Sequence, residues 1–214
     1  MVSGHLEALG LRSFGWFQPD DDGEGLLIGD AGGSHWSAFA TSGYLDGDPD
    51  PLNRWTRASL EPLAQTLNAE IRYPFGEELW PFQRWAMQAT GAKPSPIGLL
   101  LHPEFGLWWA LRGALIFDRQ SADALPRLTG DQPHACDTCL EKPCLTTCPV
   151  EAFTVGHYDV IACRAHVASP EGVDCRVHGC RARRACPVGR DHTYPDGLQS
   201  FLMQAFTGSA WEEG

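Results

Sequence analysis

All eight cysteines of this chain lie between Cys136 and Cys186, and none occurs before or after that stretch. Cysteine thiolates hold iron–sulfur clusters, and a four-iron cluster takes four of them. Eight cysteines therefore match two such clusters with none left over. The type and number of these residues predict two [4Fe–4S] clusters, whose chemistry is one-electron transfer.

The cysteines form two runs separated by the isolated Cys163. The first run reads Cys136-x2-Cys139-x4-Cys144-x3-Cys148-Pro149, and the second reads Cys175-x4-Cys180-x5-Cys186-Pro187. A Cys-Pro pair also closes the runs of bacterial two-cluster ferredoxins, in which the last cysteine of a run binds the other cluster. By that resemblance, one cluster takes Cys136, Cys139, Cys144 and Cys186. The other cluster takes Cys148, Cys163, Cys175 and Cys180.

Three other uses of the cysteines compete with this interpretation. Disulfides need an oxidising compartment, and the first residues show neither the basic nor the apolar region of a signal peptide. Zinc favours paired Cys-x2-Cys knuckles, of which the sequence has one, at Cys136 and Cys139. A Rieske centre needs two histidine ligands, and the spacing of the nearby histidines does not fit one: His134, His166 and His178.

Composition and charge narrow the classes of function. The 214 residues carry a formal net charge of −11, which argues against a nucleic-acid-binding surface. The longest apolar stretch, 106–117, is interrupted by Arg112 and is too short to span a membrane. We therefore expect a soluble, cytoplasmic protein with no nucleic-acid and no membrane partner.

A basic run accompanies the second group of cysteines. Five arginines and no acid lie between Cys175 and Arg190: Arg176, Arg181, Arg183, Arg184 and Arg190. These cations would offset the negative charge of a cluster, because buried charge is seldom left unpaired. The alternative is a docking patch that speeds encounter with an acidic redox partner.

Hydrophobic periodicity predicts a mixed α and β structure before the cysteines. Short apolar runs indicate strands at 25–28 and 71–73 and a β-hairpin that joins 97–101 to 107–117. Helical spacing predicts helices at 52–68 and 82–89. Beyond the first run we expect a small hairpin at 153–160, a helix that carries Cys163 and a helix at 195–206. Seven of the eight tryptophans precede residue 110 and form either core or the floor of a site for a flat cofactor.

The cysteine region, about Asp131 to Arg190, resembles the two-cluster ferredoxin module of epoxyqueuosine reductases and reductive dehalogenases. Those modules also place an isolated cysteine between two runs, as Cys163 lies here. The usual run is C-x2-C-x2-C-x3-C-P, whereas the gap from Cys139 to Cys144 is two residues longer. The resemblance implies a ferredoxin-like module.

The segment His102-Pro-Glu-Phe-Gly-Leu-Trp-Trp-Ala-Leu-Arg112-Gly113 is similar to a stretch of the CblC-type cobalamin-processing chaperones. That family has a nitroreductase-like α+β fold and binds cobalamin, with flavin supporting its reduction. The resemblance implies that His102 and Arg112 lie near a cofactor, either cobalamin or FMN. For Arg112 the alternative is a structural ion pair with an acid of the same domain, and for His102 it is a plain turn.

We therefore expect an α+β protein with three parts. A CblC-like, nitroreductase-like domain spans 1–125, a ferredoxin-like module with two [4Fe–4S] clusters spans 131–190, and a segment at 191–214 packs back on the first part. The first functional hypothesis is an electron-transfer protein that serves a redox partner protein. The second is a reductase whose clusters feed a corrinoid or flavin in the N-terminal domain. A third is a protein with structural or redox-sensing clusters.

Overall fold

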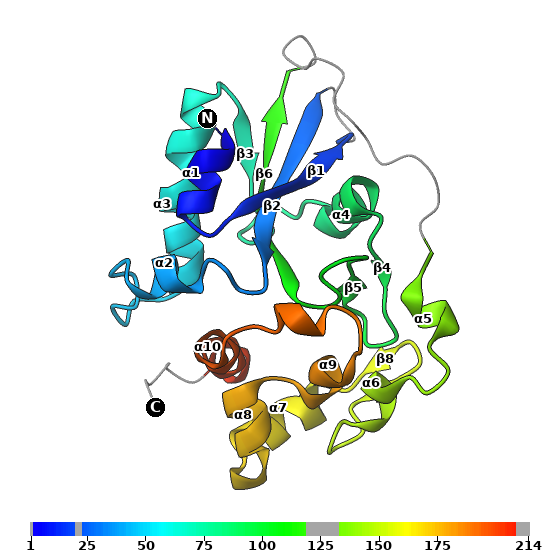
Figure 1. The fold of residues 1–214 in the computed structure, drawn as a ribbon. Coiled ribbons are helices and arrows are strands. Elements are labelled where there is room, and N and C mark those ends of the chain that lie inside the picture. Colours follow the sequence, from blue (N-terminus) through cyan, green and yellow to red (C-terminus); the bar gives the residue numbers. More distant parts are fainter. Residues whose placement is uncertain (1, 20–22, 119–132, 209–214) are drawn as a thin grey trace. The chain divides into compact units, whose positions relative to one another are not determined.

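The structure is a computed structural model that describes residues 2–19, 23–118 and 133–208 (Figure 1). The chain divides into two compact units. Unit 1 comprises Met1–Ala92 and Trp109–Gln132, and unit 2 comprises Lys93–Trp108 and Pro133–Gly214. The chain therefore leaves unit 1 after Ala92 and returns to it at Trp109. The stretch between the two predicted domains, 126–130, and the last residues, 209–214, lie outside the described residues.

The described part of unit 1 is built on a four-stranded antiparallel sheet with the order β1-β2-β6-β3. Its strands are β1 (Arg12–Phe17), β2 (Glu24–Ala31), β3 (Glu70–Arg72) and β6 (Trp109–Phe117). The two central strands are buried along most of their lengths. A strand that is covered on both faces carries a near-continuous apolar run rather than an alternating one, as 25–28 and 113–117 do.

Helices cover both faces of this sheet, with α3 and α4 on opposite sides in Figure 1. They are α1 (Val2–Ala8), α2 (Trp36–Ala40), α3 (Pro51–Thr66) and α4 (Phe82–Thr90). Trp85 of α4 stacks on Phe17 of β1, with ring centroids 4.6 Å apart, and Trp55 of α3 is also buried. The strands and helices predicted at 25–28, 71–73, 52–68 and 82–89 are all present.

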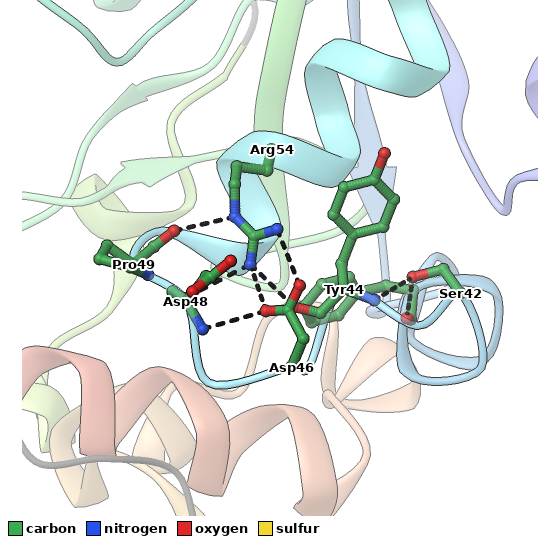
Figure 2. A network of polar contacts seen from close by, with 7 residues as sticks. Ser42, Tyr44, Asp46, Asp48, Pro49 and Arg54 are labelled. Atoms are coloured by element: carbon green, nitrogen blue, oxygen red, sulfur yellow. Dashed lines mark hydrogen bonds and ion pairs between the residues drawn. The ribbon is translucent and has the colours of Figure 1, made fainter.

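A polar network holds the loop that precedes α3 (Figure 2). The Arg54 guanidinium donates to the Asp46 carboxylate, to the Tyr44 carbonyl and to the Pro49 carbonyl. Its centre also lies 5.4 Å from the centroid of the Tyr44 ring. One partly buried side chain of the helix thereby holds three separate positions of the loop.

Unit 2 consists mainly of short elements. Its strands are β4 (Lys93–Pro94), β5 (Leu100–Leu101), β7 (Phe153–Thr154) and β8 (His157–Tyr158). Its helices are α5 (Ala135–Thr138), α6 (Pro143–Thr146), α7 (Val160–Ala168), α8 (Val173–His178), α9 (Arg181–Ala185) and α10 (Asp196–Thr207), with 3-10 turns at Pro170–Gly172 and Arg190–His192. The hairpin at 153–160, the helix carrying Cys163 and the helix at 195–206 match their predictions.

The cysteine region does not form a separate ferredoxin-like module among the described residues. Lys93–Trp108 belongs to the same compact unit as the cysteines, and α10 packs on α8 and α7 within that unit. The overall class, α+β, agrees with the prediction. No described helix is both long and apolar enough to cross a membrane.

The predicted hairpin between 97–101 and 107–117 is wrong. β5 pairs with β4, and β6 lies in the centre of the unit 1 sheet between β2 and β3. β6 is mostly buried and nine residues long, so it needs at least one long partner, which β2 supplies from Trp109 to Phe117. The two-residue β5 cannot supply one. Periodicity located both strands, but it carries no information about which strands pair.

Candidate metal centre

A first cavity in unit 2 is lined by four of the eight cysteines. Its other wall residues include Ser95, Leu107, Lys142 and Val188, and it encloses about 420 Å³, counting the part open to solvent. The cysteines are Cys136, Cys139, Cys144 and Cys186. These are the four residues that the sequence groups as ligands of one cluster.

A second cavity in unit 2 is lined by the other four cysteines. It encloses about 310 Å³ on the same measure, and Phe153, Val167 and Met203 contribute apolar wall. The cysteines are Cys148, Cys163, Cys175 and Cys180. The eight cysteines thus divide between the cavities into the two sets predicted from the spacing. Metal ligation by these sets stays a prediction.

The thiols do not converge on a single point. Among the described residues, no three His, Cys, Asp or Glu side chains gather closely enough to hold one metal ion. A zinc ion on the Cys136–Cys139 knuckle therefore finds no complete ligand set in this part of the chain. All eight cysteines are free thiols, so the disulfide alternative is also not what the structure shows. The same lack of a gathered ligand set among the described residues gives iron–sulfur clusters no support.

The five-residue helix α9 lies between the two sets of thiols. Cys180 is its N-cap and lines the second cavity, whereas Cys186 is its C-cap and lines the first. Ala182, which is fully buried, lines the second cavity and also packs in the apolar group around the first. Position 182 needs a small side chain because it contacts the surroundings of both cavities.

Burial and neighbouring thiols raise the pKa of several cysteines. Burial, with added repulsion from the thiols of Cys186 and Cys144, raises the pKa of Cys136 to about 11. Burial also raises the pKa of Cys180 to about 11, although the backbone N–H groups of Arg183 and Ala182 donate to its sulfur and oppose the shift. A cation that binds these sulfurs must displace their protons, so binding and deprotonation are coupled.

Backbone N–H groups point at other sulfurs as well. The Ala152 N–H donates to the Cys148 sulfur at 3.4 Å, and the Val188 N–H donates to the Cys186 sulfur. Such donors stabilise a thiolate more than a thiol, because the thiolate is the charged acceptor. At Cys186 the Val188 N–H opposes the burial that raises the pKa of the thiol, without cancelling it.

The five arginines of the second run fasten the loops that carry the thiols. Each guanidinium is engaged within unit 2 by backbone carbonyls or by a carboxylate. Arg176 donates to the Val167 and Ser169 carbonyls, Arg190 to the Ala185 and Cys186 carbonyls, and Arg181 and Arg184 to Asp174. Arg183 donates twice to the Leu107 carbonyl and lies between the rings of Trp108 and Tyr194, about 4.5 and 4.4 Å from their centroids. Charge compensation and a docking patch, the two roles that the sequence suggests for these arginines, both stay predictions.

The segment Lys93–Trp108 supplies one wall of the first cavity, which the sequence did not reveal. It approaches the loop after Cys186 at a glycine in the left-handed region: Gly106 has φ 57°, and a Cβ built on it would lie 2.0 Å from the Val188 carbonyl oxygen. Ser95 from this segment lines the cavity, and its buried hydroxyl oxygen has no hydrogen-bond partner. An unsatisfied buried hydroxyl in a thiol-lined cavity fits a site for a group that accepts hydrogen bonds.

His102 has a structural role in the turn that ends at Gly106. Its Nδ1 accepts hydrogen bonds from the backbone N–H groups of Glu104 and Phe105, at 3.1 and 3.2 Å. This agrees with the alternative of a plain turn residue. A cofactor contact of His102 stays a prediction.

Arg112 belongs to a buried polar cluster of unit 1 rather than to either cavity. The register of β2 with β6 shifts between Ile28 and Gly29, so that Arg112 is the extra residue of a β-bulge. Its Nε lies 3.7 Å from one carboxylate oxygen of Asp30, and the other oxygen lies 3.2 Å from His35 Nδ1. All three side chains are at least nine-tenths buried. The ion-pair alternative for Arg112 is what the structure shows, while its predicted cofactor contact stays a prediction.

Comparisons with known proteins place this chain in no family. Neither a family model nor a curated protein matches the sequence. Among solved structures, a C. elegans B12-trafficking protein CblC, a human MMACHC homologue, is similar over 99% of this chain and 96% of its own, with 15% identity and a TM-score of 0.45. A likeness this low carries no argument about fold or activity.

Proposed function

We propose that this chain is an iron–sulfur redox protein that holds two [4Fe–4S] clusters. The ligands of one are Cys136, Cys139, Cys144 and Cys186, and those of the other are Cys148, Cys163, Cys175 and Cys180. The observation that carries the proposal is the division of the cysteines between two cavities, four to each, in the sets that the spacing predicts.

The shape of the two sites supports clusters over single ions. Each thiolate of a four-iron cluster binds a different iron, so its ligands surround a volume instead of meeting at a point. Four thiols around each cavity fit that requirement. Clusters of this type supply one-electron transfer when bound.

The residues of unit 2 supply the environment that such a group needs. Leu107, Phe153 and Val167 shield the cavities with apolar surface, and N–H groups such as those of Ala152 and Val188 donate to sulfur. Burial, hydrogen bonds to sulfur and nearby charge are the means by which a protein sets a cluster potential. On this proposal the chain relays single electrons to a redox partner protein.

A second candidate is a reductase in which electrons pass from the clusters to a corrinoid or a flavin bound by unit 1. The resemblance of His102–Gly113 to cobalamin-processing chaperones suggests it, with Arg112 as the contact in unit 1, whereas His102 belongs to unit 2. One observation favours it: buried polar atoms of three side chains have no hydrogen-bond partner. They are the carboxylate oxygens of Asp30, the ring nitrogens of His35 and the Nε of Arg112. Unsatisfied buried polar groups are unusual and often mark function.

Anaerobic reconstitution of the full chain with iron and sulfide tests the proposal. We expect about eight irons per chain, a visible absorbance that dithionite bleaches reversibly, and about half the iron in Cys175→Ser. A chain that binds one or two irons, or zinc in preference, would contradict it. Titration of the loaded protein with hydroxocobalamin and then with FMN separates the candidates. A saturable spectral shift that is lost in Arg112→Ala supports the reductase, and no binding of either ligand leaves the electron carrier.

A further inference from the structure

Ser95 carries the one side-chain hydroxyl among the described residues that line the first cavity. The residue is 8% exposed, and its hydroxyl oxygen is buried without a hydrogen-bond partner. A buried hydroxyl that lacks a partner costs about 1–3 kcal/mol, so folded proteins seldom keep one that nothing satisfies. Because Ser95 lines the cavity, a group bound there is in a position to be that partner.

A tight turn fixes the backbone of Ser95. Its N–H donates to the Leu99 carbonyl at 2.8 Å, and its carbonyl accepts from the Gly98 N–H at 2.9 Å. Both backbone groups are therefore satisfied, and the hydroxyl is the only polar group of Ser95 without a partner. The hydroxyl oxygen is bonded directly to Cβ, so on this backbone it has only three staggered positions to choose from.

The chain that carries Ser95 is also tied to the chain that carries the first thiol. His134, two residues before Cys136, donates from its Nε2 to the Pro94 carbonyl at 3.0 Å. Pro94 directly precedes Ser95, so this hydrogen bond joins the neighbour of the hydroxyl to the neighbour of a cavity thiol. The same segment is joined to the loop after the last cysteine by the close approach of Gly106 described above. The hydroxyl is therefore held in place relative to the thiols.

We propose that the Ser95 hydroxyl donates a hydrogen bond to a sulfur of the cluster held in the first cavity and thereby sets the reduction potential of that cluster. This inference rests on the proposed function. Reduction by one electron adds negative charge that the sulfurs share, and a hydrogen bond to sulfur stabilises the more negative state. The hydroxyl keeps its proton in both states. Its removal lowers the potential, because the reduced cluster loses that stabilisation.

The second cavity offers an internal reference. None of the described residues that line it carries a hydroxyl, and its polar residues besides the cysteines are His166 and Arg181. Ser95 does not line this cavity. Loss of the Ser95 hydroxyl therefore changes one of the two potentials and leaves the other in place.

The test is a redox titration of reconstituted Ser95→Ala, followed by electron paramagnetic resonance and visible absorbance. We expect wild-type iron content and one midpoint at a more negative potential. The expected change in the reduced-to-oxidised ratio is about tenfold, which is about 59 mV for a one-electron couple. The shifted signal is assigned to the first cavity by its absence in Cys139→Ser. The matched control is Ser200→Ala, which should move neither midpoint: this serine of unit 2 accepts from Gln204 Nε2 and lines neither cavity.

Exchange into D2O gives a second measurement, which needs no change of sequence. The hydroxyl proton exchanges with solvent, so electron–nuclear double resonance of the reduced first cluster should show a deuteron coupling. The coupling should be lost in Ser95→Ala and kept in Ser95→Thr, which retains a hydroxyl and should retain the wild-type midpoint.

Three results overturn this inference alone. They are full iron content in Ser95→Ala with both midpoints unmoved, the same content with both midpoints moved equally, and a loaded wild type without the deuteron coupling. The last of these decides even if Ser95→Ala fails to take up iron. A wild-type chain that takes up no iron overturns the proposed function and this inference with it.

Discussion

The two units bury their polar groups in different ways. In unit 1 the carboxylate of Asp30 lies inside the core with His35 and Arg112 as its ionic neighbours, so the protein supplies its own countercharges. In unit 2 eight thiols line two cavities, and four described elements are only two residues long. A sheet between helices holds the first unit together. The second depends on its arginine contacts and, on our proposal, on the groups that its cavities hold.

On our proposal, metal binding and folding are coupled in unit 2 and not in unit 1. Binding to a folded site stabilises the fold, because the unfolded chain offers no such site. Unit 2 is therefore expected to lose structure when its thiols lose their metal, and unit 1 is not. The predictions below test that separation, beginning with the largest effect.

Removal of a ligand is expected to have the largest effect. Cys180→Ser should lower iron content from about eight to about four per chain and speed amide hydrogen exchange in unit 2, because its thiol lines the second cavity. Exchange in β2 and β6 should stay unchanged. The control Ala165→Ser, on the exposed side of α7, adds a hydroxyl without removing a thiol. Equal loss of protection in both units would remove the distinction between them.

Asp30→Asn tests the buried ion pairs of unit 1. Loss of this fully buried charge leaves Arg112 and His35 without their anion, and breaking such a pair costs about 3–5 kcal/mol. Urea unfolding monitored by hydrogen exchange in β2 and β6 measures the loss. Glu61→Gln on the exposed side of α3 is the matched control. We expect the iron content of Asp30→Asn to equal that of the wild type.

Arg183→Lys tests whether the arginine contacts stabilise unit 2. Lysine keeps the charge but loses the planar fork that donates twice to the Leu107 carbonyl and stacks between Trp108 and Tyr194. We expect a loss of about 1–2 kcal/mol from the combined contacts, measured by thermal release of iron. Arg181→Lys, whose ion pair with Asp174 is partly exposed, should cost less. Equal effects would mean that charge alone matters.

The smallest effect concerns the exposed network of Figure 2. The hydrogen bond from Arg54 lowers the pKa of Asp46 from 3.8 to about 2. A lowered pKa in the folded state contributes stability that is present above 3.8 and is lost as the pH falls toward about 2. Hydrogen exchange in the first turn of α3 should rise over that interval. In Asp46→Asn the rise should be absent, whereas exchange in unit 2 should not distinguish the two proteins.

Local signals predicted much of this fold. The apolar runs at 25–28 and 71–73 and the helical spacing at 52–68 depend on neighbouring residues only, and each element formed. The pairing of β6 with β2 and β3, by contrast, is decided by contacts far apart in sequence. The bulge at Arg112 and the contact with Asp30 depend on that pairing. No local pattern contains them.

In the candidate site, too, features set by local sequence were predicted and features set by distant contacts were not. The resemblance of the cysteine runs to those of two-cluster ferredoxins predicted which four thiols share each cavity. It did not predict Ser95 or Leu107 in the wall of the first cavity, because they lie 41 and 29 residues before Cys136, in a segment that carries no cysteine. The arginines were visible as a charged run, but their partners are mostly carbonyl oxygens. Every residue has a carbonyl, so residue types do not identify such partners.

The excursion of Lys93–Trp108 into unit 2 has a consequence for how the protein is made and divided. During synthesis the ribosome releases Ser95 and Leu107 long before Cys186. The first cavity is therefore complete only after Cys186 has been made. Likewise, β6 enters the middle of its sheet only after the chain has passed through the other unit. No single cut in the gene separates the two units intact. Recombination that moves only the cysteine segment therefore leaves Lys93–Trp108 behind, and unit 2 is incomplete without it.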